Sequence, residues 1–432
     1  MSHHSPVVKR ALCRTPNTCH INAGSLGSAI FRASRCYNTR PSVTRKTRLQ
    51  PGADSGPALL SASNTRVSNP LDQSHGSRDL RRPILRSATT SALHNTAPAP
   101  PTAYAPPSTG LLSYLPKSWV PYAELIRLDK PTGTYYLYFP CLFSTLLAAP
   151  LTTPITPPLT VLGYSALFLT GALIMRGAGC TINDLWDRNL DPHVARTRLR
   201  PIARGAISPR QAVIFTGAQL LTGLAVLLQF PPACLAYGVP SLALVATYPL
   251  AKRVTHYPQF VLGLTFSWGA IMGFPALGVD LLADARALQA AALLYASCVS
   301  WTVLYDMIYA HMDIKDDVKA GIKSIALRHE KDTKVVLTGL AVAQVGLLAA
   351  AGAAVGAGPV FFVGSCGSAV ATLGTMIWRV NLKDVGNCWW WFKYGCWFTG
   401  GGVAAGLLGE YVARLSGLYG DSQGKAAVAM LS

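Results

Sequence analysis

One short polar string combines residue types and a spacing that suit metal chemistry. It reads NDLWDRNLD and contains Asn183, Asp184, Asp187 and Asp191. Residues three or four apart share one face of a helix, so we expect these side chains to lie together. Crowded carboxylates repel one another unless a cation or hydrogen bonds compensate them, and their hard oxygen atoms suit Mg²⁺. The spacing therefore predicts a magnesium site with these four residues as ligands.

A second acidic string, YDMIYAHMDIKDDVKAGIKS, contains Asp313 and Asp317. Their spacing again places two carboxylates on one helix face. If the two strings face each other across a helical bundle, they could hold two metal ions that bridge one diphosphate. The ions would neutralise the charge that develops as diphosphate leaves an allylic carbon.

Basic residues flank both acidic strings and are candidate contacts for phosphate oxygens. They are Arg196, Arg198, Arg200, Lys252, Arg253, Lys315, Lys319 and Lys323. Arginine would bind the phosphate in bidentate fashion, and lysine would act as a point charge. The alternative for each of them is that it only sets the orientation of the chain in a membrane.

Long apolar stretches must position these residues. They run near Thr134–Ala149, Leu159–Ile182, Gln211–Phe230, Ala233–Leu250, Gln259–Gly278, Ala287–Tyr309, Lys334–Val355, Val360–Ile377 and Asn387–Ala413. Each is near the length of a bilayer span. A composition with 50% hydrophobic and only 13% charged residues agrees with a lipid-facing surface. We therefore predict an all-α, polytopic membrane helical bundle of about nine transmembrane helices, with one domain over residues 114–416 and a short tail over 417–432.

Charge in the connections predicts the orientation of this bundle. Basic residues follow every second span: Arg196, Arg198, Arg200, Arg204, Lys252, Arg253, Lys315, Lys319, Lys323, Arg328, Arg379 and Lys383. The opposite connections are almost without charge. The positive-inside rule therefore places both acidic strings on the same side of the membrane as the N-terminus.

The N-terminal segment has the composition of a targeting sequence. Nine lysine and arginine residues precede Asp54, the first acidic residue, among many Ser, Thr and Asn. This pattern predicts a mitochondrial transit peptide over residues 1–54, and the Ser- and Pro-rich residues 55–113 are predicted to be disordered. The alternative is a generic basic tail. Much of the formal charge of +19 lies in this segment, so we expect no nucleic-acid partner.

The two acidic strings resemble the motifs of the UbiA superfamily of intramembrane prenyltransferases. The first family motif, NDxxDxxxD, is similar to the string from Asn183 to Asp191, and the second, DxxxD, is similar to that from Asp313 to Asp317. Three further strings resemble the branch of 4-hydroxybenzoate polyprenyltransferases that acts in ubiquinone synthesis. They are RLDKPTGT, RTRLRPIARG and YPLAKRVTHYPQFVLG.

The resemblance implies a reaction and its partners. A Mg²⁺-bound polyprenyl diphosphate would ionise and be attacked by the ring carbon of 4-hydroxybenzoate beside the hydroxyl. The enzyme would sit in the mitochondrial inner membrane with its Asp-rich loops in the matrix. Its partners would be the two substrates, the lipid bilayer and other enzymes of ubiquinone biosynthesis.

The resemblance makes Arg127 and Lys130 candidate contacts for anionic substrate groups and Asp191 a candidate proton acceptor; the other roles below are assigned from charge and place in the chain. Catalysis is assigned to Asp191, Arg196 and Lys252, with Asp191 a candidate to remove the phenolic or ring proton. Substrate binding is assigned to Arg127, Lys130, Arg200, Arg253, Tyr309, Lys315, Lys319 and Lys323.

Two alternatives remain open on the sequence alone. A family member with another acceptor, such as homogentisate, haem or naphthoate, would share the Asp motifs. An ion or metabolite transporter would also carry acidic residues at membrane helix ends, although transporters usually place them near the midplane and often have repeated halves.

Overall fold

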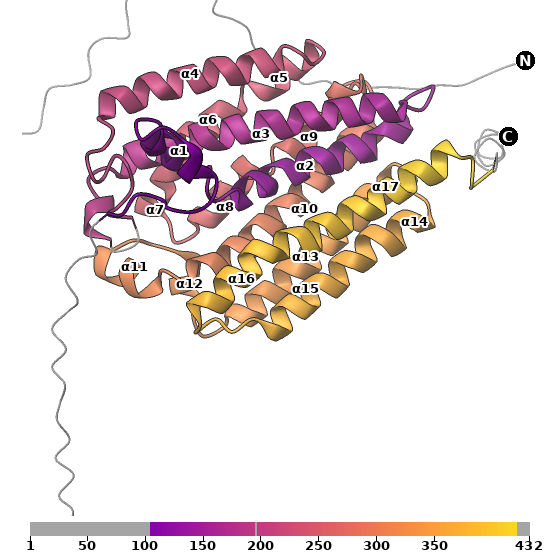
Figure 1. Ribbon diagram of the computed structural model, residues 1–432. Coiled ribbons are helices and arrows are strands. Elements are labelled where there is room, and N and C mark those ends of the chain that lie inside the picture. The colour runs from indigo at the N-terminus through magenta and orange to yellow at the C-terminus, as the bar shows by residue number, and fades with distance from the viewer. Residues whose placement is uncertain (1–103, 195–196, 421–432) are drawn as a thin grey trace, which may run out of the picture. The chain divides into compact units, whose positions relative to one another are not determined.

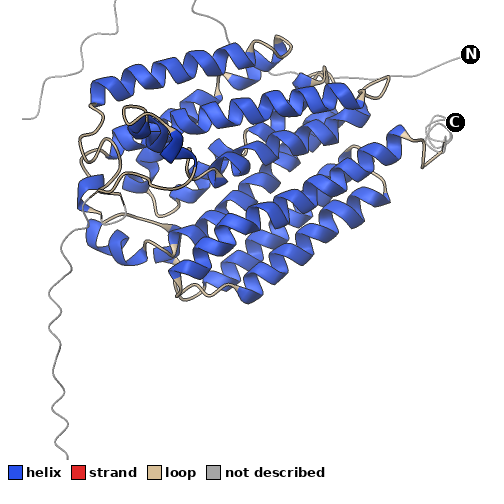
Figure 2. Ribbon diagram, viewed as in Figure 1, coloured by secondary structure: helices blue, strands red, loops and turns tan. Residues whose placement is uncertain are grey.

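The computed structural model describes residues 104–194 and 197–420, which belong to one compact unit. Within these residues the regular structure is helical throughout (Figure 2). The α-helices are α1 (Val120–Leu125), α2 (Thr132–Ala148), α3 (Pro158–Asp187), α4 (Pro209–Leu227), α5 (Ala233–Gly238), α6 (Ser241–Thr247), α7 (Ala251–Val254), α8 (Pro258–Phe266), α9 (Gly269–Ala276), α10 (Ala285–Ala310), α11 (Ile314–Ala320), α12 (Ile325–Arg328), α13 (Thr333–Ala354), α14 (Pro359–Phe361), α15 (Gly367–Arg379), α16 (Val385–Gly395) and α17 (Gly402–Leu415). Short 3-10 helices include η1 (Leu111–Tyr114), η3 (Asp191–His193) and η4 (Tyr248–Leu250), and π-helical turns form η5 (Phe362–Cys366) and η6 (Cys396–Gly401).

Six helical segments of the described chain are long and apolar enough to cross a membrane. They are Pro158–Asp187, Pro209–Leu227, Ala233–Leu250, Ala285–Ala310, Thr333–Ala354 and Pro359–Arg379. The predicted all-helical membrane bundle is thereby confirmed. The other three predicted spans correspond to α2, to the pair α8 and α9, and to the run α16, η6 and α17. They fall short as single α-helices because α2 has 17 residues and the other two are interrupted.

The interruption between α8 and α9 has a local cause in close helix packing. The Ser144 hydroxyl on α2 donates to the Gly269 carbonyl at 2.8 Å and accepts from the Gly273 amide at 3.0 Å. A Cβ atom on Gly273 would clash with the α2 backbone at Thr145. The glycines therefore let α9 approach α2 at backbone distance directly after the interruption.

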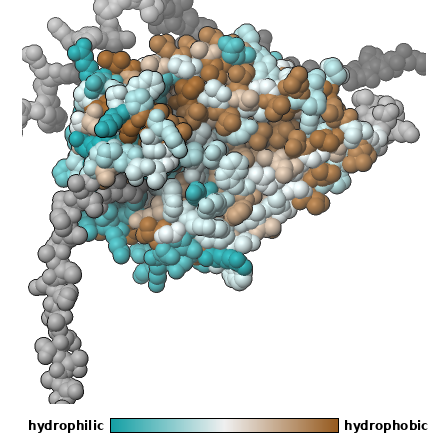
Figure 3. Space-filling model, viewed as in Figure 1, coloured by the Kyte–Doolittle hydropathy of each residue, from teal (hydrophilic) through white to brown (hydrophobic). Residues whose placement is uncertain are grey.

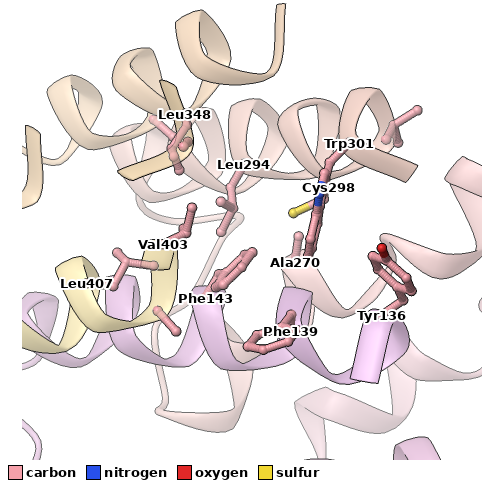
Figure 4. Packing of buried hydrophobic residues seen from close by; sticks show 14 of the residues in the cluster. Tyr136, Phe139, Phe143, Ala270, Leu294, Cys298, Trp301, Leu348, Val403 and Leu407 are labelled. Carbon is pink, nitrogen blue, oxygen red and sulfur yellow. The ribbon is translucent and has the colours of Figure 1, made fainter. Parts of the chain in front are cut away.

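Aromatic packing around α10 forms the centre of the bundle (Figure 4). The Trp301 ring of α10 lies with its centroid 6.2 Å from that of Phe139 and 6.0 Å from that of Phe143, both on α2. Burial of such apolar surface is the main favourable contribution to packing inside the bundle. Helices α2 and α10 therefore form a fixed frame for the elements that carry the acidic strings.

Both acidic strings lie at one end of the bundle. In Figure 1 the end of α3, the short α7 and α11 gather at the left, and Figure 3 shows hydrophilic surface there and hydrophobic surface over much of the rest of this face. The same end carries α1 and the stretch before it. Residues 104–110 lead into η1.

Candidate active site

The first acidic string forms a buried carboxylate cluster. Asn183, Asp184 and Asp187 occupy the last turns of α3, and Asp191 begins η3 just beyond it. Asp184, Asp187 and Asp191 are buried, with relative exposures of 0%, 1% and 5%. Three carboxylates in so little contact with water require compensating cations or hydrogen bonds.

Two arginines compensate part of this negative charge. Arg127 Nη2 donates to both carboxylate oxygens of Asp184 at 2.8 Å. Arg200 Nη1 lies 3.1 Å from Asp184 Oδ1 and 3.0 Å from Asp191 Oδ2, and so joins the two carboxylates. The structure thus places Arg127 and Arg200, both predicted to bind substrate, directly at the predicted metal ligands.

Arg253 lies at the edge of the cluster. Its Nη2 atom donates to the Trp186 carbonyl at 2.8 Å and lies 3.8 Å from Asp187 Oδ1. This contact connects α7 to the end of α3. Lys252 lies on the same short helix, but its side chain is not described, and Arg196 falls outside the described residues.

The electrostatics of the cluster fit a bound cation. Burial raises the pKa of the Asp191 carboxyl above its ordinary value, and Asp184 and Asp187 raise it further against the opposing effect of Arg200. Burial alone would lower the pKa of the Arg200 guanidinium, but Asp184 and Asp191 outweigh it and raise that pKa. The carboxylates therefore still repel one another with the arginines in place, and a hard divalent cation would relieve that repulsion.

Asp191→Asn is expected to stabilise the metal-free protein at neutral pH. A carboxyl whose pKa is raised by folding binds its proton more tightly in the folded state than in the unfolded state. The ionised carboxylate therefore lowers the free energy of unfolding. This loss of stability is absent below the pKa of the unfolded state, about 3.9, and grows as pH rises through the pKa of the folded state. We expect an unfolding midpoint about 2 to 4 °C above wild type at pH 7 without Mg²⁺, and no difference near pH 3.5. Tryptophan fluorescence during heating in detergent measures it, and a lower midpoint at pH 7 would contradict the repulsion.

The second acidic string lies at the start of α11. Asp313 is the N-cap residue of this helix, and the Asp317 amide donates to the Asp313 carbonyl at 2.8 Å. Lys323, just beyond α11, donates to the Val254 carbonyl of α7 at 3.3 Å. Because Arg253 ties α7 to the end of α3, the two acidic strings are linked through α7.

The described side chains do not complete a metal site by themselves. Within residues 104–194 and 197–420, no three His, Cys, Asp or Glu groups lie close enough to hold a metal ion. A Mg²⁺ ion held there would take water and phosphate oxygens to complete its shell, as Mg²⁺ usually does.

The remaining predicted substrate contacts have other surroundings. Lys130 is exposed, and its ammonium group lies 3.2 Å from Asp129. Lys315 is exposed, and Lys319 lies 4.0 Å from Asp316. Tyr309 is half-buried near the end of α10, with its ring 4.6 Å from that of Phe392. The roles of these residues in substrate binding stay predictions.

An apolar cavity of about 240 Å³ opens beside the cluster. Helices α2, α3, α4, α6, α8 and α9 contribute to its wall, which is almost entirely apolar. Its polar end is formed by Arg176 of α3 and by Tyr248, whose hydroxyl donates to the Gly179 carbonyl at 3.4 Å. Leu224, Val239 and Leu242 line it and are also exposed on the bundle surface, so the cavity reaches the lipid-facing side.

A family model for the UbiA prenyltransferase family matches residues 137–399, which include both acidic strings, most of the cavity wall and the helices between them. The chain belongs to the UbiA prenyltransferase family. This agrees with the resemblance that the two Asp strings indicated.

Similar UbiA-family proteins carry the same name in several organisms. The chain is 47% identical over 298 residues to the "4-hydroxybenzoate polyprenyltransferase, mitochondrial" of Schizosaccharomyces pombe, an alignment that covers 69% of this chain and 82% of the relative. It is 45% identical over 312 residues to the protein of that name in Saccharomyces cerevisiae, covering 71% and 80%. It is 40% identical over 352 residues to that of Caenorhabditis elegans, covering 81% and 92%.

Solved UbiA-family structures share the fold. The apo structure of a UbiA homolog from Aeropyrum pernix K1 aligns with a TM-score of 0.50 and 24% identity over 66% of this chain and 98% of that one. A UbiA homolog from Archaeoglobus fulgidus bound to GPP and Mg²⁺ aligns with a TM-score of 0.50 and 17% identity, covering 68% and 99%.

Arg176 is a candidate site residue that the motif analysis missed. Its guanidinium lies against Gly133 of the PTGT string, where a Cβ atom would clash with it, and donates to the Cys180 sulfur. Its Nε atom is buried and has no hydrogen-bond partner among the described residues. A signal was present in the sequence, because a lone arginine inside a membrane span, two helical turns before Asn183, is rare without a function.

Proposed function

We propose that this UbiA-family chain transfers a polyprenyl group from polyprenyl diphosphate to the ring of 4-hydroxybenzoate, ortho to the hydroxyl, and releases diphosphate in ubiquinone biosynthesis. The observation that carries the proposal is the junction at Arg176. There, Arg176 and Tyr248 at the polar end of an apolar cavity open to lipid lie within electrostatic range of Asp184 in the buried cluster of carboxylates and arginines. The cavity suits a hydrocarbon tail, and the cluster suits a diphosphate with its metal ions.

The first acidic string would hold the metal at the diphosphate end. Asn183, Asp184, Asp187 and Asp191 offer hard oxygen atoms on one helix end, and Asp313 and Asp317 would contribute from the second string. Mg²⁺ bound there would neutralise charge on the departing diphosphate. The Archaeoglobus fulgidus homolog was solved with GPP and Mg²⁺, which supports this choice of ion.

Arg127 and Arg200 would bind the diphosphate oxygens. Both guanidinium groups lie at the carboxylates that would hold the metal ion, and guanidinium groups bind phosphate oxygens well. As the bond between the allylic carbon and the phosphate oxygen breaks, the electron pair leaves with the diphosphate. Fixed positive charges stabilise that leaving group without further reorganisation.

The cavity would protect the allylic cation until the acceptor attacks. Its apolar wall excludes water, which would otherwise hydrolyse the cation. The ring carbon beside the phenolic hydroxyl forms the new bond and then loses its proton. Asp191 is the candidate to receive that proton, because it lies beside Arg200 at the diphosphate end of the site.

Arg176 would bind the carboxylate of 4-hydroxybenzoate. It lies at the polar end of the cavity, and its buried Nε atom has no acceptor among the described residues. A bidentate carboxylate would satisfy this donor and would orient the ring between the cavity and the acidic cluster. Arg176 thus joins Arg127 and Lys130, which were predicted only as contacts for substrate, as the residue proposed for the acceptor carboxylate.

The proposed location of the reaction follows from the relatives and the fold. The three relatives named above are mitochondrial proteins, and the described chain has six helices able to span a membrane. Basic residues gather in the same connections as the acidic strings, which favours an inner-membrane enzyme with its Asp-rich loops in the matrix.

An activity assay tests the proposal directly. Membranes containing the expressed chain are incubated with radiolabelled 4-hydroxybenzoate, a polyprenyl diphosphate and Mg²⁺, and lipid-extractable product is counted. We expect prenylated acid that disappears when Mg²⁺ is chelated. Product with homogentisate but not with 4-hydroxybenzoate would show that the acceptor is homogentisate. Ion or metabolite uptake by sealed vesicles without any product would favour a transporter.

Gly179→Phe is expected to lower transfer by obstructing the cavity. Gly179 lines the cavity on α3, and no atom lies within 4 Å of the place where its Cβ would be. An aromatic ring there would fill space proposed for the prenyl chain, and kcat/KM should fall at least about 10-fold. The same assay measures it across several diphosphate concentrations.

Gly339→Phe is the matched control for this variant. Gly339 lies on the exposed side of α13, again with no atom within 4 Å of the Cβ position. Its kcat/KM should stay near wild type. Equal losses in both variants would mean that a bulky residue in any membrane helix is harmful and that the cavity is not special.

A further inference from the structure

Three side chains form a cluster just outside the carboxylates. Arg204 Nη2 lies 2.6 Å from Glu124 Oε2, and the Tyr104 hydroxyl donates to Glu124 Oε1 at 2.9 Å. The Arg204 guanidinium also lies over the Tyr104 ring, 3.8 Å from its centroid. Each residue thus contacts both of the others, across a sequence separation of 80 residues between Glu124 and Arg204.

The backbone connects this cluster to both arginines of the site. The Glu124 carbonyl accepts from Arg127 Nη1 at 2.9 Å, and the Arg204 amide donates to the Arg200 carbonyl at 2.9 Å. Arg127 and Arg200 in turn both contact Asp184. The contacts therefore form a closed ring from Asp184 through Arg127, Glu124, Arg204 and Arg200 back to Asp184.

Backbone strain in this ring occurs at Arg127. This residue has φ of 59°, in the left-handed region that side chains other than glycine rarely adopt. Strained residues of this kind persist only where surrounding contacts hold them, and they concentrate at functional sites. The turn after α1 is thus held in a form that brings the Arg127 guanidinium to Asp184.

We propose that Glu124, Arg204 and Tyr104 are positioning residues that hold Arg127 and Arg200 ready for the diphosphate. The inference rests on the proposed function, because it assigns these residues to the diphosphate end of that reaction. Glu124 fixes the turn that carries Arg127, and Arg204 fixes the loop that carries Arg200. Tyr104 holds the Glu124 carboxylate and covers the Arg204 guanidinium. The stretch before the first membrane helix is therefore part of the site.

The pair is largely buried, which makes a stability control necessary. The side chains of Arg204 and Glu124 are 13% and 16% exposed. Removal of one partner from such a pair leaves the other charge poorly compensated and also lowers stability. The positioning role is therefore read from KM for the diphosphate relative to KM for 4-hydroxybenzoate, which a general loss of stability would not separate.

Kinetics of Glu124→Gln, Arg204→Gln and Tyr104→Phe in the full chain test the proposal. We expect KM for polyprenyl diphosphate to rise about 10-fold in the first two, as for the loss of one charge-assisted hydrogen bond, and less in Tyr104→Phe. KM for 4-hydroxybenzoate should change little, and the unfolding midpoint is measured beside it so that kinetics are compared at equal folded fractions. In the double variant Glu124→Gln/Arg204→Gln, KM for the diphosphate should be no higher than in the more impaired single variant, because both substitutions remove the same ion pair.

Matched controls remove the same groups elsewhere. Glu330→Gln, Arg286→Gln and Tyr114→Phe each change an exposed residue and should leave both KM values unaltered. The positioning role is overturned if KM for the diphosphate is unchanged in Glu124→Gln, or if kcat alone falls in step with the folded fraction. Additive effects in the double variant would also overturn it.

A second readout separates this inference from the proposed function. Inorganic diphosphate with Mg²⁺ should protect the loop of residues 197–208 from trypsin in wild type, and the protection should need about 10-fold more diphosphate in Glu124→Gln. If wild type makes no prenylated acid, the proposed function fails while this protection still decides the positioning role. Equal protection in both proteins would end the inference even in an active enzyme.

Discussion

Asp187→Asn should abolish prenyl transfer, with a rate at least about 1,000-fold below wild type at saturating Mg²⁺, a loss of about 4 kcal/mol in transition-state stabilisation. Asp187 is the last residue of α3 and is buried. It is the middle aspartate of the first acidic string, between Asp184 and Asp191 in the chain. An amide keeps the shape of the side chain but removes the negative charge that a divalent cation requires. Raising the Mg²⁺ concentration should restore little activity.

Asp332→Asn is the control for this substitution. Asp332 is exposed at the N-cap of α13, and its side chain makes no capping hydrogen bond. Its activity should match wild type in the radiolabel assay. If Asp187→Asn kept more than about one tenth of the wild-type rate, the first acidic string would not be the main metal site.

Arg176→Gln should raise KM for 4-hydroxybenzoate about 100-fold while leaving KM for the prenyl diphosphate nearly unchanged, because a buried charge-assisted pair to the acceptor is lost. A neutral acceptor tests the assignment further. Wild type should prenylate 4-hydroxybenzyl alcohol far more slowly than the acid, and the variant should treat the two alike. Specificity of this kind arises when a buried polar group of the site is left unpaired by the wrong substrate.

Stability provides an independent check on Arg176. A buried cation whose Nε has no partner among the described residues is costly in a membrane, so its removal should not lower the unfolding midpoint. Arg188→Gln is the control, since Arg188 is exposed and donates to the Leu185 carbonyl.

The kinetic outcome that would contradict the acceptor role is an equal increase in KM for both substrates in Arg176→Gln. It would show that Arg176 supports the fold of the site and does not select the acceptor.

Local patterns in the sequence were sufficient for the bundle and for the carboxylate cluster. Apolar runs of bilayer length predicted the helices, and the spacing from Asn183 to Asp191 predicted carboxylates brought together at a helix end. Each of these two features depends only on residues close together in the chain. The close approach of α9 to α2 after the interruption at residues 267–268 depends instead on the distance between two backbones, which no local pattern encodes.

The partners of the carboxylates could be predicted only in part. Arg127 and Arg200 were chosen for charge and resemblance, and the structure brings both to Asp184. Glu124, Tyr104 and Arg204 were not chosen, because their contacts join segments distant in sequence and each alone looks like an ordinary charged or aromatic residue. Arg176 was overlooked because a single basic residue barely changes the hydropathy of a long apolar run.

The exposed rim of the cavity bears on the length of the isoprenoid tail that a cell's quinone carries. Leu224, Val239 and Leu242 line the cavity and also face the lipid, so a tail that enters between them can continue outward into the bilayer. An opening of this kind sets no limit on the length of the hydrocarbon tail. We therefore expect the number of isoprene units to be decided by the reaction that synthesises the diphosphate, and this chain to accept whatever length that reaction supplies.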